Sequence, residues 1–572
     1  MDLFMVILGY IIPYGRKDML DFARDKELWK RVRESEDFSQ HRSELFALYE
    51  KAFEAEPRPH SAKEILENND HGLWRLQFDQ LQSSALLSLI YPENREYYDN
   101  LLKIVWAYLG EYTWAPLGHY TEFYYQRTPR DFDFGLLDIF ATSVAFGLAE
   151  VKNLFKDRFP QLLLDRISYE IRRRTIEPFL ERKFFWESHN NNWTAVCTSA
   201  VGSVLIYEAP DIYYENKERI DKALRCYLDS YKDDGMCVEG VGYWEFGFGF
   251  FTSFALLERE LTGGRVDRFK EEKVKEIAKF LQKTFLQDNV IVTFSDSSVT
   301  QHYFFGVWHT LRHVYGEELE PLPKCHGFVV KDNTHFNFAL RAFIYYDTKN
   351  ISDTLRKDVV YAGKDSNYFI KRTKAYGFAV KGGDNGESHN HIDVGSFILA
   401  RNNKQIICDV GAGPYEDGYH TERRYTFFHP SAYAHNIPLF DGQGEDSKRR
   451  EDVICQYDGK SRVYLDFTNG YGFDFLKRAE REFTLQEKEI TLRDHFDLTE
   501  SKEITEHFVS LIEPKITGDV AVIDDVTLIS QIPPRVSVKE VRAHMGNRPH
   551  NVYIIDYILP KGQVDFELKF KM

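Results

Sequence analysis

The stretch from Glu387 to Tyr415, "ESHNHIDVGSFILARNNKQIICDVGAGPY", combines a predicted hairpin with a concentration of polar side chains. An apolar run "GSFILA", a polar turn "RNNK" and a β-branched run "QIICDV" predict two antiparallel strands. His389, His391 and Asp393 are two residues apart, so on an extended chain they would point to the same face. Imidazoles and a carboxylate on one face indicate a metal site or a proton-transfer site.

The C-terminal part of the chain around this hairpin is also predicted to form strands. Alternation of apolar and polar residues predicts strands in "THFNFALRAFIYYD", "AYGFAVKGG", "RVYLDF", "REFTLQEKEITLRDHFDL" and "VYIIDYIL". From about Lys17 to Tyr315 the apolar spacing is instead helical, as in "LLDIFATSVAFGLAEV", "WTAVCTSAVGSVLIY" and "YWEFGFGFFTSFALLERE". Helices followed by strands indicate an α+β protein with segregated parts.

The length of 572 residues exceeds what one core of ordinary size takes, so we expect two domains or one large repeat-like domain. We place the boundary near Glu320. Residues 1–320 would form the helical domain, and residues 321–572 would form the strand domain.

The formal charge of −16 argues against a nucleic-acid partner, because binding phosphates requires a concentrated basic surface. It also provides no long-range attraction for an anionic substrate. Binding of acids would therefore depend on local clusters, which are "RRR" at 172–174, "RR" at 423–424 and "KRR" at 448–450. We interpret the first and last as solvated surface.

The six cysteines show no CxxC spacing, which favours free thiols in a reducing compartment. The opening "MDLFMVILGYIIPYGRKDML" contains an apolar run too short to span a bilayer, and we expect it in the core. An acidic residue precedes the run where a signal peptide needs positive charge. We therefore expect a cytoplasmic protein without a membrane partner; it would be secreted or periplasmic if a leader precedes this sequence.

Two further polar groups lie at predicted helix starts. In "WESHNNNWTAVC", Asn191 and Asn192 precede an apolar helix, and one asparagine suffices to cap it. The remaining amides would be available to bind a ligand carboxylate, so both interpretations stay open. In "DGMCVEGVGYWEFGFGF", Tyr243 stands at the helix entrance, where a tyrosine belongs to the core, caps the helix or takes part in catalysis.

His391, Asp409 and His435 are metal-competent side chains around one predicted sheet. A lone histidine in a strand is usually a satisfied polar residue, but three such groups together suggest a ligand set. Two imidazoles, a carboxylate and water suit a tetrahedral zinc ion, although the same set can take manganese.

Together, the segments "HNNNWTAVC", "EGVGYWEFG", "FSDS", "SHNHIDVGSF", "CDVGAGPY" and "SAYAHN" resemble the heparinase II/III-like polysaccharide lyases, which include glycosaminoglycan and alginate lyases. The motifs recur in order from about Glu111 to about Phe440, more than half of the chain. The resemblance implies an incomplete (α/α) toroid followed by an antiparallel β-sandwich, with the active site between them.

The resemblance also implies a reaction. Such lyases remove the C5 proton of a uronic acid and break the O4 glycosidic bond, leaving a 4,5-unsaturated uronide. Asn192 or Asn191 would neutralise the substrate carboxylate, and Tyr243 would protonate the leaving oxygen. For one C5 epimer Tyr243 could also take the proton, and His389 would be the base for the other or would assist neutralisation of the carboxylate. His391, Asp409 and His435 match the family's metal positions.

Further residues are assigned to substrate binding, with Glu239 as an orienting group and Arg423 as a positive neighbour of the tyrosine. These residues are His189, Glu239, Trp193, Arg423, Trp114 and His119.

We expect an anionic polysaccharide or oligosaccharide as substrate, with a glycosaminoglycan (heparan sulfate, hyaluronan or chondroitin type) favoured over alginate. Two other classes stay open: a glycoside hydrolase on a helical toroid, which would use paired carboxylates, and a non-catalytic sugar-binding protein.

Overall fold

The computed structural model describes residues 5–7, 10–12, 21–67, 72–116, 119, 136–298, 303–323, 327–355, 357–363, 365–416, 418–543 and 549–572. Of the apolar N-terminal run, the structure describes the short strands β1 (Met5–Ile7) and β2 (Tyr10–Ile12), and the expected burial of the run stays a prediction. Cys325 lies outside the described residues. The other five cysteines are free, in agreement with the expected thiols.

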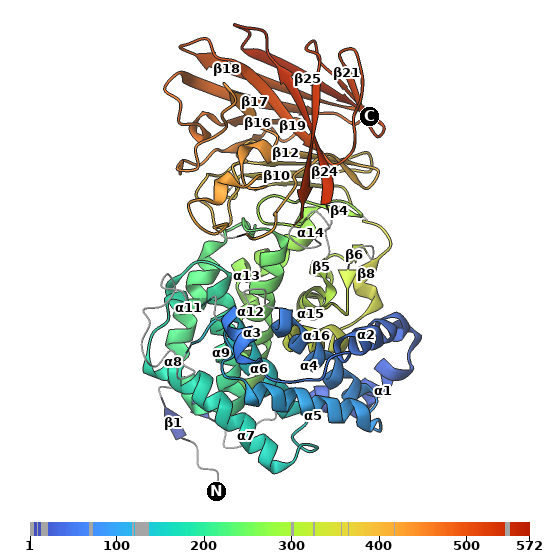
Figure 1. The fold of residues 1–572 in the computed structure, drawn as a ribbon, viewed down its shortest axis with the longest axis vertical. Coiled ribbons are helices and arrows are strands. Elements are labelled where there is room, and N and C mark those ends of the chain that lie inside the picture. Colours follow the sequence, from blue (N-terminus) through green and yellow to red (C-terminus); the bar gives the residue numbers. More distant parts are fainter. Residues whose placement is uncertain are drawn as a thin grey trace.

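The N-terminal half of the chain is helical (Figure 1). Its helices are α1 (Lys26–Glu34), α2 (Ser39–Ala52), α3 (Ala62–Glu67), α4 (Gly72–Ile90), α5 (Arg95–Gly110), α6 (Ile139–Leu154), α7 (Gln161–Ile171), α8 (Glu177–Glu181), α9 (Asn192–Glu208), α10 (Pro210–Glu215), α11 (Lys217–Ser230), α12 (Val241–Leu261), α13 (Glu272–Ala278), α14 (Phe280–Thr284), α15 (Phe305–Tyr315) and α16 (Phe336–Ile344). No helix in the described part of the chain combines the length and apolarity that a bilayer span requires.

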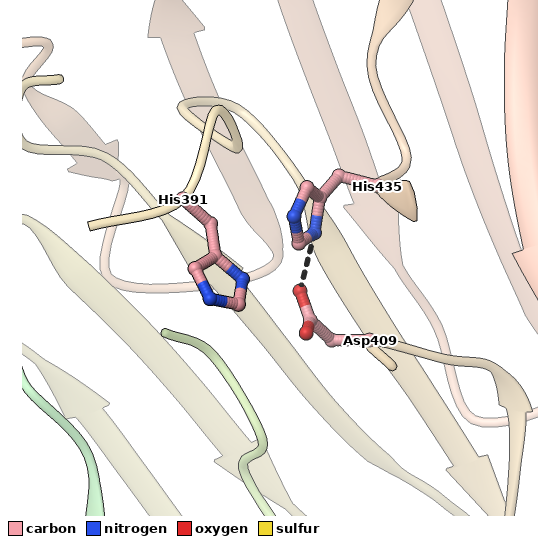
Figure 2. A group of neighbouring side chains, drawn as sticks. All are labelled: His391, Asp409 and His435. Carbon is pink, nitrogen blue, oxygen red and sulfur yellow. Dashed lines mark hydrogen bonds and ion pairs between the residues drawn. The ribbon is translucent and has the colours of Figure 1, made fainter. Parts of the chain in front are cut away.

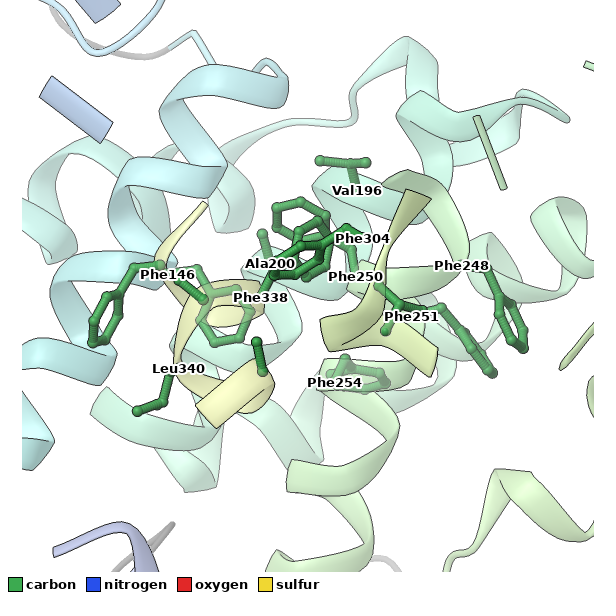
Figure 3. Close-up of a cluster of buried hydrophobic side chains, with 14 of the residues drawn as sticks. Phe146, Val196, Ala200, Phe248, Phe250, Phe251, Phe254, Phe304, Phe338 and Leu340 are labelled. Atoms are coloured by element: carbon green, nitrogen blue, oxygen red, sulfur yellow. The ribbon is translucent and has the colours of Figure 1, made fainter. Parts of the chain in front are cut away.

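Helix α9 lies inside this domain and contacts α6, α11 and α12. Its residues from Thr194 to Ile206 are all buried, which agrees with the helix predicted for "WTAVCTSAVGSVLIY". Aromatic side chains from neighbouring helices fill the space around it (Figure 3). Phe250 and Phe254 of α12 are 0% exposed, and burying each such ring contributes roughly 1.5–3 kcal/mol.

The sequence prediction was wrong for "THFNFALRAFIYYD", because Phe336–Ile344 is helix α16 and not a strand. The residues alternate, but Phe336, Leu340, Phe343 and Ile344 also fit a helical stripe, and all four are buried. Helix α16 packs against α4, α12 and α15. Helical packing therefore continues beyond the boundary that we placed near Glu320.

The C-terminal part consists of antiparallel sheets that stand on the helical domain (Figure 1). A five-stranded sheet has the order β13-β12-β11-β10-β9, a four-stranded sheet β14-β19-β24-β23, and an eight-stranded sheet β15-β16-β17-β18-β25-β22-β21-β20. The first contains β9 (Val359–Ala362), β10 (Tyr368–Arg372), β11 (Gly377–Lys381), β12 (Phe397–Arg401) and β13 (Lys404–Ile407). The second contains β14 (Pro438–Phe440), β19 (Ile504–Ser510), β23 (Arg535–Arg542) and β24 (Pro549–Ile558). The third contains β15 (Cys455–Tyr457), β16 (Arg462–Asp466), β17 (Leu476–Leu485), β18 (Glu489–Leu498), β20 (Lys515–Thr517), β21 (Val520–Ile523), β22 (Val526–Ile529) and β25 (Asp565–Lys571).

The three sheets share one apolar core. Phe397 of β12 lies 5.0 Å from Phe483 of β17 and 5.9 Å from Phe508 of β19, measured between ring centroids. The predicted hairpin is β12 and β13, and its turn residues Asn402 and Asn403 have φ of 50° and 59°. Positive φ at both central residues is what a tight type I′ hairpin requires, and asparagine tolerates it.

The two parts meet along the segment that follows α14. Short strands β3 (Phe285–Gln287) and β4 (Val290–Ile291) pair there, and β3 contacts β10, β11 and β12. The next residues enter the β-domain, where the Thr293 hydroxyl donates to the Asp409 carbonyl at 2.9 Å. The Ala412 amide donates to the Ser297 carbonyl at 2.8 Å. These bonds place loop 292–298 between the helices and the sheets.

Candidate active site and metal centre

The polar residues singled out by sequence meet where the N-terminus of α12, loop 292–298 and two loops of the β-domain converge. Gly240, which precedes α12, has φ of 104°, and a Cβ there would lie 2.2 Å from the Ser297 hydroxyl. Only glycine permits both this backbone conformation and this approach. The start of α12 is thereby pressed against loop 292–298.

Tyr243 and His389 come from the two different domains and stack with ring centroids 4.0 Å apart. The Tyr243 hydroxyl lies 2.9 Å from the hydroxyl of Tyr415. Burial, and next the negative charge of Asp296, raise the pKa of Tyr243 well above its ordinary value. The phenol is therefore protonated at neutral pH, which suits a proton donor better than a base.

The carboxylate of Asp296 is the centre of the hydrogen-bond network. Its Oδ2 lies 2.8 Å from His389 Nδ1, and its Oδ1 lies 3.0 Å from His391 Nε2. Oδ1 also accepts from the Tyr419 hydroxyl at 3.1 Å and from Arg424 Nη2 at 2.8 Å. Burial alone would raise the pKa of Asp296, but these donors hold it well below its usual range.

Arg424, and not the predicted Arg423, is the arginine of this network. Arg424 is buried and also donates to the backbone carbonyls of His389 at 3.0 Å and Asn390 at 2.9 Å. Arg423 is exposed, and its guanidinium lies near Gly418 at the surface of the same loop. A sequence pair "RR" gives no sign of which residue turns inward.

The expectation that His389, His391 and Asp393 share one face of a strand was wrong. They lie in a loop, and His389 has φ of 55°. His389 and His391 both reach Asp296, whereas Asp393 turns to the buried Lys381, whose Nζ lies 2.7 Å from Asp393 Oδ1. The loop therefore contacts two charged groups, the carboxylate of Asp296 through its histidines and the ammonium of Lys381 through Asp393.

Asn191 and Asn192 have different environments. Asn191 caps α9, because its side chain accepts from the Trp193 amide at 3.2 Å. Asn192 is 6% exposed, and its carboxamide has no hydrogen-bond partner among the described residues. A Cβ on Gly247, one helical turn after Tyr243, would lie 3.3 Å from the Asn192 Cβ. Asn192 therefore packs against α12 one helical turn after Tyr243.

Glu239 is buried in the turn before α12. Burial raises its pKa, opposed by the positive charge of His389 and by the Ser388 side chain. His389 acts on Glu239 electrostatically, and the orienting role expected of Glu239 stays a prediction.

The other predicted binding residues lie along α9 and its neighbours. Trp193 is partly buried, with ring centroids 5.0 Å from His119, and His119 Nδ1 is 2.6 Å from Asp138. His189 is exposed beside Phe185. Trp114 is 2% exposed, and its indole donates to the Tyr108 carbonyl at 2.8 Å. Its surroundings are those of a core residue, which does not favour the predicted contact with substrate.

His391, Asp409 and His435 converge as the sequence predicted (Figure 2). All three are buried, and one potential ligand atom of each lies within 4.8 Å of the others. His435 Nδ1 is 2.9 Å from Asp409 Oδ2, and His435 Nε2 is 2.9 Å from the His429 carbonyl. The three residues come from two loops and the segment after β13.

The hydrogen bonds of this trio test whether it fits a metal. His435 Nε2 must carry a proton to reach the His429 carbonyl, and His391 Nε2 must carry one to reach Asp296. With neutral rings, both Nδ1 atoms are then lone-pair donors. His391 Nδ1 is buried without a partner among the described residues, and His435 Nδ1 faces a carboxylate. Two lone pairs and a carboxylate in one buried place fit a divalent cation.

Several residues of the site were missed at the sequence level, namely Asp296, Tyr415, Tyr419 and Arg424. Asp296 and Tyr415 stand in the segments "FSDS" and "CDVGAGPY", so the motifs included them without indicating their roles. The signal that identifies them is tertiary, because each is defined by contacts to distant residues.

The chain has the two-domain fold seen in solved polysaccharide lyases, and the predicted incomplete (α/α) toroid followed by antiparallel sheets is confirmed. Residues 357–546 match the family model described as Heparinase II/III-like, C-terminal. This region is therefore similar to that C-terminal domain, as the sequence motifs implied.

Three solved structures illustrate the similarity. Heparan sulfate lyase HepC from Pedobacter heparinus superposes with a TM-score of 0.57 at 12% identity, covering 96% of this chain and 92% of that one. Chondroitin AC lyase from Streptomyces coelicolor A3, in complex with chondroitin sulphate, gives 0.55 at 9% identity, covering 96% and 82%. Xanthan lyase from Paenibacillus gives 0.57 at 9% identity, covering 97% and 60%. No curated protein sequence matches the chain.

Proposed function

We propose that this protein is a polysaccharide lyase that cleaves a uronic-acid-containing polysaccharide by β-elimination. The observation that carries the proposal is the stacking of Tyr243 on His389 with ring centroids 4.0 Å apart. Asn192 packs against α12 one turn after Tyr243, and its carboxamide has no hydrogen-bond partner among the described residues. An acid, a base and a neutral amide donor are the groups that abstraction of a proton next to a carboxylate requires.

The reaction assigns one task to each group. Asn192 hydrogen-bonds the substrate carboxylate and stabilises the enolate that develops there. His389 Nε2 takes the C5 proton, the C4=C5 double bond forms, and the C4–O4 bond breaks with its electron pair on O4. Tyr243 gives its proton to that oxygen. No water enters the products, and the proton on His389 returns to Tyr243 through solvent or directly.

Environment separates the acid from the base. The raised pKa of Tyr243 keeps its proton available for the leaving oxygen. His389 Nδ1 faces the Asp296 carboxylate, so Nδ1 is the donor of that pair and Nε2 is free to accept a proton. Tyr415 orients the Tyr243 hydroxyl through the bond between their hydroxyls.

We assign a divalent metal, zinc in preference to manganese, to His391, Asp409 and His435. When bound, the ion would supply a fixed positive charge that cross-links the loops of the β-domain beside His389. The residues that perform proton transfer lie outside this ligand set, so the chain's own side chains carry the chemistry.

The arrangement disfavours the alternative of a glycoside hydrolase. Such an enzyme needs two carboxyl groups free to act on either side of the sugar. Asp296 accepts from four donors, so it is not free to act on a sugar. A carboxylate held by two histidines, a tyrosine and an arginine cannot also deliver a proton.

We propose a glycosaminoglycan as the substrate class, with alginate as the next candidate. The titles of two structural neighbours name heparan sulfate and chondroitin sulphate, which are both glycosaminoglycans. The net charge of −16 gives no general attraction for polyanions, so recognition would depend on the cleft.

The test is incubation of the purified protein with heparan sulfate, hyaluronan, chondroitin sulfate and alginate, followed by absorbance at about 232 nm and product sizing. A conjugated C4=C5 product supports the proposal. Chain cleavage without that absorbance would show hydrolysis, and binding without any cleavage would show a sugar-binding protein.

A further inference from the structure

The two carboxylate oxygens of Asp296 have different hydrogen-bond partners. Oδ1 accepts from His391, Tyr419 and Arg424, whereas Oδ2 is 2.8 Å from His389 Nδ1 and has no other donor among the described residues. One carboxylate thus contacts both the candidate base and a candidate metal ligand. None of the sequence motifs assigned it a role.

Contacts within the chain hold Asp296 in position. Loop 292–298 is fastened to the β-domain by the bond from the Ala412 amide to the Ser297 carbonyl. Gly411 permits this approach, because it has φ of 58° and a Cβ there would lie 2.2 Å from the Ser297 oxygen. Arg424 donates to Asp296 and to the His389 carbonyl, and so links loop 292–298 to the loop that carries His389.

A carboxylate can only accept at Oδ2, so the ring nitrogen opposite must donate. His389 is thereby fixed as the Nδ1–H tautomer, and its Nε2 lone pair is directed away from Asp296. The same logic applies to His391, whose Nε2–H donates to Oδ1 and leaves Nδ1 toward Asp409 and His435. One side chain therefore sets the tautomer of both histidines.

We propose that Asp296 is the positioning residue of the active site, which fixes the tautomer of His389 for proton abstraction and couples it to the metal-ligand histidine His391. The proposal rests on the proposed lyase function for its catalytic consequence. Its structural content, the tautomer of His389, is independent of the substrate and of turnover.

Asp296→Asn is the sharpest perturbation, because it changes one oxygen to an amide with almost no change in volume. Oδ1 has three donors around it, so the amide oxygen stays there and Nδ2 takes the place of Oδ2. Nδ2 donates to His389 Nδ1, which moves the ring proton to Nε2. The base is then blocked although every ring keeps its place.

We expect kcat to fall on the order of 10²- to 10⁴-fold in Asp296→Asn, with KM within about threefold of the wild type. The metal content should stay at the wild-type value, because Oδ1 still accepts from His391. Tyr419→Phe removes a different donor from the same carboxylate and leaves His389 paired, so its kcat should fall less than about tenfold.

Glu506→Gln is the matched control for a buried carboxylate changed to an amide. Glu506 is buried in β19 and lies 3.3 Å from Arg481, far from α12 in the sequence and outside the site described above. Its kcat should remain at the wild-type value. Thermal unfolding of all variants shows whether each is folded.

A ¹⁵N-histidine spectrum of the wild type, with His389 assigned by its loss in His389→Ala, tests the proposal without turnover. A protonated Nδ1 and an unprotonated Nε2 on His389, exchanged in Asp296→Asn, support it. A protonated Nε2 in the wild type overturns it, even if Asp296→Asn fails to fold. A wild type that produces no unsaturated product from any uronan would overturn the lyase function and leave this tautomer result intact.

Discussion

Replacing Tyr243 by phenylalanine removes one hydroxyl and keeps the ring that stacks on His389 at 4.0 Å. The hydroxyl has one described partner, the Tyr415 hydroxyl at 2.9 Å. Loss of one such hydrogen bond costs about 0.5–1.5 kcal/mol in the free energy of unfolding. The variant should therefore remain folded, and a loss of activity can be attributed to chemistry.

The expected effect on turnover is much larger than the effect on stability. Burial and the charge of Asp296 raise the pKa of Tyr243, so the wild-type phenol carries its proton throughout the neutral range. Losing a positioned general acid lowers kcat by roughly 10²- to 10⁴-fold, which corresponds to about 2.7–5.5 kcal/mol. KM should change little, because the hydroxyl acts on the leaving oxygen.

The assay is the initial rate of absorbance at about 232 nm against substrate concentration, with thermal unfolding as the folding check. Tyr415→Phe is the matched control, since it removes the partner hydroxyl and leaves the donor in place. We expect that control to lose less than tenfold in kcat. If Tyr243→Phe keeps more than a tenth of the wild-type kcat, a loss under about 1.4 kcal/mol, Tyr243 is not the acid.

Three further outcomes are expected. Asn192→Ala should lower kcat more than it raises KM, because enolate charge develops in the transition state; an effect on KM alone would indicate ground-state binding only. His391→Ala should lose the metal and lower the unfolding temperature, whereas His389→Ala should keep the metal and lose activity. If elemental analysis finds the metal in His391→Ala and not in His389→Ala, His389 is the metal ligand and His391 the base. Lys381→Met should cost about 3–5 kcal/mol in denaturant unfolding by leaving the Asp393 charge buried and unpaired, and a neutral change would show that Asp393 is not ionised there.

Much of the architecture could be predicted because it depends on local periodicity. The hairpin β12–β13 follows from a polar turn between two apolar runs, and α9 follows from its helical stripe. Helix α16 could not be predicted in this way. In "FNFALRAFI" the apolar residues satisfy both a period of two and a period near 3.6, and packing on α4, α12 and α15 decides between them.

The same distinction between local sequence signals and tertiary contacts applies to the site residues. His391, Asp409 and His435 could be grouped through motifs, and their convergence is confirmed. Asp296 could not be identified, because its partners His389 and Arg424 lie 93 and 128 residues away in the sequence. No local sequence pattern indicates hydrogen bonds between residues so far apart in the chain.

The two halves of the proposed reaction lie on different domains, and this has a physical consequence. Tyr243 and Asn192 belong to helices α12 and α9, whereas His389 and the metal ligands belong to loops of the β-domain. Their relative placement depends on loop 292–298, which leaves the helical part and carries Asp296 into the β-domain. The proposed metal site lies on the same side as the proposed base, so loss of the ion should disturb His389 before it disturbs Tyr243 or Asn192. In this proposal the helical core positions the acid and the amide, whereas Asp296 positions the base, and the ion proposed at His391, Asp409 and His435 would hold the neighbouring loop.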